Sequence, residues 1–346
     1  LYKIIDGSPL NGDQPLTPTL KAPDGRPIYN QTGRNTYKGG LYTESGGERD
    51  VWSVAFSRYF NDGDGSFSMG YTHQDIQELS GMASTTANSS YGKYAASDYN
   101  NRTAQRSIYE TEHRFFATAS STHYFLGADK PTTFNLYFER KSGLPGTYSW
   151  DTYTSSNYGG TAYQQEAFGY EKNLNDDSSH LLYVPSGVSD PNVCWGSCAA
   201  PDLAIAAQVL DTLYNKLGLQ GYAGQIVPNG VYEYPWRTSL DLKITQILPG
   251  FRAEDEFVIS LGIMNLLNLL DSDKGEAKYG PYNGKMAVLD MYMNDDFTKY
   301  IYPNYRGRGY PDYAYGFNSS NPKGIRKSAV NSIWRAQLGF TYKFSF

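Results

Sequence analysis

The stretch NSIWRAQLGFTYKFSF, residues 331–346, alternates between two kinds of side chain and decides the fold. Apolar or aromatic residues occupy every second position: Trp334, Ala336, Leu338, Phe340, Tyr342, Phe344 and Phe346. The positions between them hold Arg335, Lys343 and small or polar residues. Successive side chains of a β-strand point to opposite faces of the sheet, so the stretch predicts a strand with one apolar and one polar face.

Four earlier stretches repeat this alternation. They are DVWSVAFSRYF (50–60), GSFSMGYTHQ (65–74), TTFNLYFERK (132–141) and YPWRTSLDLKIT (234–245). Each is about 10 residues long, which is the length of a tilted strand that crosses a bilayer. The chain therefore reads as all-β, with several strands of membrane-spanning length.

The connections between these strands fall into two classes that broadly alternate along the chain. The short ones carry turn residues and cover 61–65, 126–130 and 248–255, and the long, polar ones cover 77–104, 143–231 and 305–331. Tight turns at one end and long loops at the other are typical of outer-membrane barrels.

The predicted strands number about 10. The first lies within 26–45. Two more, at 286–293 and 297–305, separate a strand at 256–268 from the strand that ends the chain.

Charged residues recur on the polar side of these strands. They are Glu139, Lys141, Arg237, Asp241, Lys243, Arg335 and Lys343. In a soluble β-sandwich or propeller, the main alternative, an unpaired charge on a buried face costs several kcal/mol. In a transmembrane barrel the same side chains face a water-filled lumen, and the aromatic rows face lipid. The sequence therefore favours a transmembrane antiparallel β-barrel with these seven residues toward the lumen.

The last strand is expected to close the barrel, because an open sheet edge in lipid leaves backbone groups unpaired. Its closing side chains are Trp334, Leu338, Phe340, Tyr342, Phe344 and Phe346. A terminal aromatic residue on an alternating strand resembles the signal by which outer-membrane barrels are recognised for assembly.

Composition excludes several other classes of protein. The 346 residues have a mean hydropathy of −0.55, and no apolar run approaches the roughly 18 residues of a transmembrane helix. A net charge of −5 argues against a nucleic-acid partner. The first ten residues, LYKIIDGSPL, show no signal peptide, so the chain is either cytoplasmic or an internal piece of a longer protein.

The loop 143–231 holds three features of interest. Cys194 and Cys198 are expected to form a disulfide, and 201–219 is expected to form a short helix that packs on its own loop. Aromatic residues of the loop either contact a ligand or pack the loop on itself. These candidates are Tyr148, Trp150, Tyr153, Tyr158 and Trp195.

No catalytic motif can be placed, and the four histidines are scattered along the chain. The acidic stretches at 61–66 and 271–276 do not complete a calcium loop and are read as turns. We therefore expect neither an enzyme, nor a cofactor, nor a metal site.

Several stretches in order resemble one family, the TonB-dependent outer-membrane transporters of the Oar-like type. They are DGRPIYN (24–30), EHRFFATASSTHYF (112–125), TTFNLYFERKSGLPGTYSW (132–150), LLYVPSG (181–187), PWRTSLDLKITQILPGF (235–251), FVISLGIMNLLNLLDSDKG (257–275) and WRAQLGFTYKFSF (334–346). The likeness is best at 113–148 and 231–270 and breaks down within 150–230.

The resemblance implies that residues 1–346 are the C-terminal part of one barrel of about 22 strands, into which the loop 143–231 is inserted. A signal peptide, a plug domain and the remaining strands would precede it. It further implies location in the outer membrane of a Gram-negative bacterium, contact with lipid, and transport of a ligand driven by the TonB complex. The alternative function is that of an adhesin or structural barrel whose long loops bind a surface or a protein.

Overall fold

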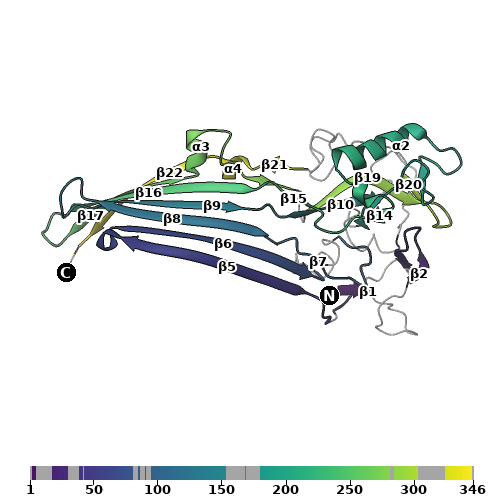
Figure 1. The fold of residues 1–346 in the computed structure, drawn as a ribbon, viewed down its shortest axis with the longest axis horizontal. Helices are drawn as coiled ribbons and strands as arrows, with labels where there is room; N and C mark the ends of the chain where they lie inside the picture. The colour runs from purple at the N-terminus through teal and green to yellow at the C-terminus, as the bar shows by residue number, and fades with distance from the viewer. Residues whose placement is uncertain are drawn as a thin grey trace.

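The computed structural model is mostly β-sheet with few helices. It describes residues 2–4, 18–29, 39–41, 43–80, 85, 90, 95–152, 168, 180–280, 284–302 and 324–344. Two parts are visible in Figure 1: one long sheet and, at one end of it, a folded unit built from the long connections. We call the second part the loop unit; it comprises the described residues of 18–29, 95–102, 145–234 and 284–302.

The long sheet is a single layer of antiparallel strands. Its strands follow the order β22-β17-β16-β9-β8-β6-β5, and the short β7 also pairs with β6. Their bounds are β5 Glu48–Phe60, β6 Gly65–Glu78, β7 Gln105–Arg106, β8 His113–His123, β9 Thr132–Lys141, β16 Arg237–Pro249, β17 Glu256–Met264 and β22 Arg335–Lys343. The alternating stretches of the sequence therefore form neighbouring strands of one sheet.

The tight turns of the long sheet all lie at the end away from the loop unit (Figure 1). In the turn between β5 and β6, Asn61 and Asp62 adopt φ values of 51° and 52°, and Gly63 follows at 105°. Asn, Asp and Gly tolerate this left-handed region better than other residues, which explains their place in the turn. The described C-terminal residues also lie at this end.

The predicted strands at 286–293 and 297–305 do not belong to the long sheet, so that prediction was wrong. β17 pairs directly with β22, whereas β19 (Lys285–Met293) pairs in parallel with β10 (Pro145–Thr152). Consecutive residues Met286 to Leu289 are all buried, so β19 is covered on both faces. A strand covered on both faces belongs in a core, where parallel pairing is common.

The described residues of 26–45, where the first strand was expected, add no strand to the long sheet either. The strands described there are β3 (Pro27–Tyr29), which pairs with β2 (Pro18–Lys21), and β4 (Gly39–Leu41), which pairs with β1 (Tyr2–Ile4). The described long sheet therefore begins with β5.

The loop unit is built around a second sheet in the order β11-β10-β19-β20-β13, with β15 paired to β10. The additional bounds are β11 His180–Leu181, β13 Val193–Trp195, β15 Tyr232–Glu233 and β20 Tyr300–Tyr302. A separate pair joins β12 (Tyr183–Val184) to β14 (Gln225–Ile226). Segments more than 100 residues apart in sequence thus meet in one unit.

The hydrophobic core of the described chain lies in the loop unit. Trp150 is 0% exposed, and its ring lies 4.7 Å from that of Tyr300 and 6.5 Å from that of Phe168. The guanidinium of the buried Arg26 lies over the Trp150 ring and donates a hydrogen bond to the Leu181 carbonyl. The long connections are therefore packed with their own aromatic residues.

The expected loop helix is present as α2 (Leu203–Leu210), whose first turn is capped by the Asp202 carboxylate, which accepts from Ala204 N–H. A π-helical turn over Asp211–Lys216 continues it. The remaining elements are the 3-10 turns Asn61–Gly63 and Gln220–Tyr222, α3 Leu266–Leu270, α4 Ala329–Ser332, β18 Lys278–Tyr279 and β21 Arg326–Lys327. No helix in the described ranges is long and apolar enough to cross a membrane.

Replacing Trp150 by Ala should destabilise the loop unit by about 3–5 kcal/mol, because a large buried ring is lost and a cavity is left. The measurement is protease sensitivity of the intact protein across a urea series. Trp236→Ala is the matched control, since Trp236 is 38% exposed and should matter much less. Equal losses in the two variants would contradict this placement of the core.

Candidate functional site

The register of the long sheet puts most of the apolar side chains of its strands on one face, although a few, such as Phe116 and Val258, lie on the other. Leu242 lies opposite both Leu136 and Ile263, and Leu261 lies opposite Leu338. We call this the apolar face; its main residues are Val54, Phe56, Met69, Ala117, Leu136, Phe138, Leu240, Leu242, Ile244, Leu261, Ile263, Leu338 and Phe340. Val54 and Phe340 are each 62% exposed, so the described chain leaves much of this face uncovered.

The seven charged residues singled out in the sequence all lie on the opposite, polar face. Glu139, Lys141, Arg237, Asp241, Lys243, Arg335 and Lys343 have the same strand parity once the registers are followed. Arg114 Nε lies 2.7 Å from Glu139 Oε1, and Lys343 Nζ lies 3.0 Å from Glu256 Oε2. Some of these charges therefore pair with a neighbouring strand.

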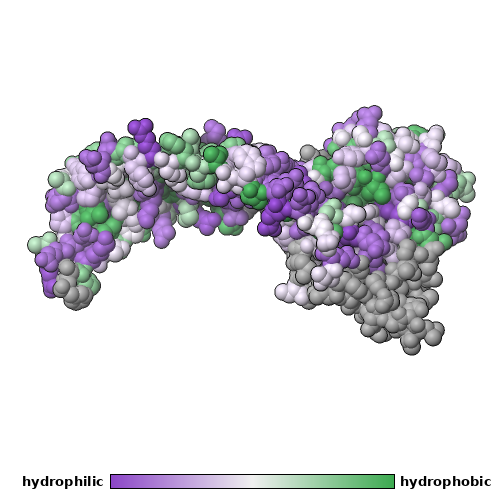
Figure 2. Space-filling view, turned by 60° about the horizontal axis from the view of Figure 1, so that its bottom comes forward, coloured by the Kyte–Doolittle hydropathy of each residue, from purple (hydrophilic) through white to green (hydrophobic). Residues whose placement is uncertain are grey.

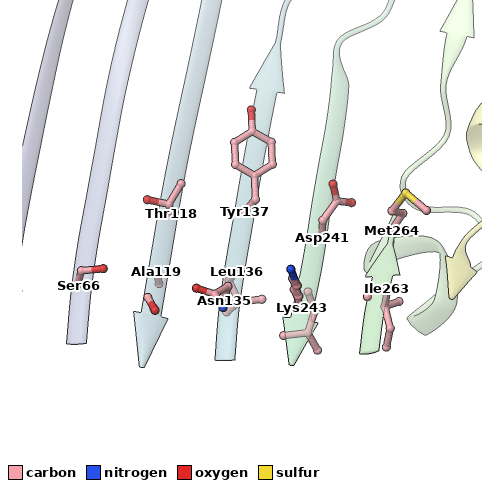
Figure 3. A pocket seen from close by; sticks show the side chains of 13 residues that line it. Ser66, Thr118, Ala119, Asn135, Leu136, Tyr137, Asp241, Lys243, Ile263 and Met264 are labelled. Atoms are coloured by element: carbon pink, nitrogen blue, oxygen red, sulfur yellow. The ribbon is translucent and has the colours of Figure 1, made fainter. Parts of the chain in front are cut away.

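The polar face is hollowed. A hollow of about 490 Å³ lies over β6, β8, β9, β16 and β17, and Figure 3 shows Thr118, Tyr137 and Asp241 on three neighbouring strands that line it. Lys243 lines it as well, and a Cβ added at Gly262 would meet open space there. This hollow offers hydroxyls, a carboxylate and an ammonium group to a polar ligand.

Asp241 also has a structural role. Its Oδ1 accepts a hydrogen bond of 2.8 Å from the backbone N–H of Asn265, which has a positive φ of 56° at the start of α3. The Asn265 amide in turn donates to the carbonyls of Gly275 and Ser332. The hollow is thus tied to the connection that follows β17.

Aromatic rings gather at both ends of the sheet. The cluster beside the loop unit, which we call the rim cluster, comprises Trp52, Tyr71, His73, His113, Phe115 and Trp236, with neighbouring ring centroids 4.6–6.3 Å apart. Three smaller groups of rings lie at the turn end: His123 with Phe125 and Phe134, Phe251 with Tyr342 and Phe344, and Phe257 with Phe340. Aliphatic side chains dominate the apolar face between them.

The proposed closing residues lie on or beside β22, at an edge of the described sheet. Leu338, Phe340 and Tyr342 belong to the apolar face, and Trp334 and Phe344 flank the strand. The Tyr342 hydroxyl donates to Asp255 Oδ2 at 2.6 Å and accepts from Phe251 N–H at 2.9 Å, which fixes it to the β16–β17 turn. Phe346 lies outside the described residues.

Three of the aromatic ligand candidates are core residues instead. Tyr148, Trp150 and Trp195 are 1%, 0% and 2% exposed, because they pack inside the loop unit, so they cannot form a rim that contacts a ligand. Tyr153 and Tyr158 lie outside the described residues. Cys194 and Cys198, expected to pair, are joined by a disulfide.

The sequence reasoning missed a polar group within and beside the rim cluster. His73 on β6 lies opposite His113 on β8, with Nδ1 atoms 3.4 Å apart, and Glu112 Oε1 lies 3.2 Å from His113 Nε2. The sequence signal for this group would have been two histidines that the alternation places on the same face of two alternating strands that follow each other along the chain.

Next to these histidines, three carboxylates surround one guanidinium. Arg106 lies within 2.7 Å of Glu110, Glu112 and Glu233. Burial and the adjacent Glu233 raise the pKa of Glu112. Burial is the largest single effect on Glu233 and acts in the same direction, but the hydrogen bonds with Arg106 and Glu112 and the charge of Arg106 together lower the pKa of that carboxyl. The carboxylates outnumber the single cation at their centre, so this group attracts positive charge.

No protein-family model, curated protein sequence or solved structure matches this chain.

Gly70 and Gly262, two strand glycines of the polar face, differ in the space above them, which gives a test of the hollow. Gly262→Leu should change the free energy of unfolding by no more than about 0.5 kcal/mol, because its side chain enters open space. Gly70→Leu should destabilise by about 1–3 kcal/mol, because its Cβ would lie 2.5 Å from the Phe116 ring. Denaturant unfolding of both variants measures the difference; a larger loss in Gly262→Leu would refute the open hollow.

Proposed function

We propose that this chain forms part of the wall of a transmembrane β-barrel in the outer membrane of a Gram-negative bacterium. The observation that carries the proposal is the apolar face, where Val54, Phe56, Leu338 and Phe340 are all more than half exposed. In water an uncovered face of this size is a liability, whereas hydrocarbon would cover it at no cost.

The dimensions of the sheet support a membrane setting. β8 has 11 residues. At about 3.4 Å per residue it spans about 37 Å, and at a tilt of about 40° it crosses about 28 Å, close to the hydrocarbon thickness of a bilayer. The aromatic clusters at the two ends of the sheet correspond to the two girdles with which such barrels meet the headgroup regions.

The polar face would then line a water-filled lumen. Charges such as Lys243 and Asp241 remain hydrated there, which removes the cost of burying them. β5 and β22 each have one long neighbour in the described sheet, so further strands would complete the wall. These strands, and a plug inside them, would be contributed by the same longer protein.

We infer that the activity is TonB-dependent transport of a ligand through this barrel. This inference is supported by the resemblance of several stretches, in the same order along the chain, to Oar-like transporters. The hollow beside Asp241 and Lys243 would supply a polar surface along the inner wall. The part that responds to the TonB complex would lie in the plug. The chain itself would contribute the wall, the lining and a folded loop unit.

The loop unit favours a second candidate, an adhesin or structural barrel. Its buried core around Trp150 and Tyr300 makes it a folded body, which is a suitable platform for binding a surface or a protein. The two functions differ in whether they need the energy that the TonB complex supplies. Loss of the TonB complex should abolish ligand uptake by cells carrying the intact protein, whereas adhesion should persist without it.

Cysteine labelling at two neighbouring positions tests the membrane setting. Ile244→Cys on the apolar face should resist a water-soluble maleimide in lipid vesicles, and Lys243→Cys on the polar face should react at least about 10-fold faster, because only the second position faces water. Both positions lie on β16, an interior strand of the long sheet, and the native cysteines are already bonded to each other.

Labelling of the unfolded protein in urea, where both thiols should react at similar rates, controls for intrinsic reactivity. Rapid labelling of Ile244→Cys in folded, vesicle-bound protein would contradict lipid cover of this face.

A further inference from the structure

The rim cluster brings two imidazole rings together at the end of the long sheet beside the loop unit. His73 comes from β6 and His113 from β8, and the register sets them directly opposite each other. Their Nδ1 atoms are 3.4 Å apart. Together with Glu112 they offer potential ligand atoms that all lie within 4.8 Å of one another.

A carboxylate lies behind His113. Glu112 Oε1 lies 3.2 Å from Nε2, the ring nitrogen that faces away from the proposed ligand atom Nδ1. Arg106 binds the other carboxylate oxygen at 2.7 Å and holds Glu112 in this orientation. A carboxylate behind a histidine in this way is a common support of metal sites.

We propose that His73 and His113 bind a divalent transition-metal ion of the zinc, copper and nickel class through their Nδ1 atoms, with Glu112 as a positioning residue. Two nitrogens at about 2.0–2.1 Å from a tetrahedral zinc ion are about 3.4 Å apart. The observed separation of 3.4 Å, which holds a hydrogen bond between the two rings in this structure, matches that spacing.

The surroundings favour such an ion. Trp236 stacks on His113 at 5.8 Å and Trp52 lies 5.6 Å from His73, so aromatic neighbours restrain both rings. The Tyr71 hydroxyl lies within hydrogen-bond distance of His113 Nδ1, at 2.8 Å, so a bound ion would replace this hydrogen bond and would draw its oxygen ligands from water or from this hydroxyl. Imidazole with oxygen donors is a ligand set that this class of metals accepts.

Charge and access also agree with cation binding. The carboxylates around Arg106 leave an excess of negative charge beside the histidines. The side chains of His113 and Glu112 are 32% and 31% exposed, so an ion can reach them from solvent. A bound ion would cross-link β6 to β8 where the long sheet meets the loop unit.

The test is a titration of the intact, untagged protein with zinc in detergent, in which calorimetry measures the binding. The protein is first treated with a chelator to remove any bound metal. One ion per chain should bind. His73→Ala and His113→Ala should each weaken zinc binding by more than about 100-fold, because each removes a ligand. Glu112→Gln should weaken it by roughly 10–100-fold, because Glu112 only orients the ligand His113. Glu112→Asp, which keeps the carboxylate, should recover part of that loss.

His123→Ala is the matched control, because His123 lies at the opposite end of β8 and should not affect zinc binding. Cobalt absorption in the visible range gives a second readout of tetrahedral nitrogen and oxygen ligands in each variant, and near-UV circular dichroism checks that the variants fold. No zinc binding by the folded wild-type protein, or binding that survives both histidine substitutions, would overturn the proposal. The titration needs no plug, TonB complex or transported ligand, so its result is separate from the test of transport.

Discussion

The apolar face of the long sheet needs a cover that the described chain does not supply, and this requirement governs the architecture. A soluble β domain buries such a face under a second layer. Here the aromatic residues that could build that layer, such as Trp150 and Tyr300, pack against each other in the loop unit. The sheet is left as a single layer, an arrangement that suits a medium that is apolar on one side and aqueous on the other.

The long sheet is arched in the view of Figure 2, and the hollow over its polar face marks the concave side. Side chains on the concave side of a sheet crowd together, so small residues favour this shape. The polar face carries such residues at Ser66, Ser68, Gly70, Ser260 and Gly262, of which Ser66 and Gly262 line the hollow. The same small side chains leave open space beside Asp241 and Lys243, which line the hollow as well. The arched shape and the open polar face thus come from one feature of the sequence.

The faces of the strands could be predicted from the sequence because alternation is a local property. The position of the short apolar stretch that forms β19 could not be predicted. Its pairing with β10 joins segments about 140 residues apart, and hydrophobic periodicity alone does not distinguish a strand of the long sheet from a strand of the loop-unit core. For the same reason Tyr148, Trp150 and Trp195 were expected to be possible ligand contacts, although burial decides their role. The rim histidines meet through the register of β6 against β8, which the alternation within each strand does not specify.

In the proposed membrane setting, that register would also position the sheet relative to the bilayer. His73, His113 and Arg140 have apolar-face parity, yet they lie together at the loop-unit end, where the Arg140 guanidinium lies 5.4 Å from the Trp236 ring. Polar groups on a lipid-facing side are costly in hydrocarbon and favourable at the headgroup level, where they lie beside Trp and Tyr. The boundary of the hydrocarbon would therefore run just below this row, and the proposed metal ion would sit at the interface, outside the hydrocarbon core.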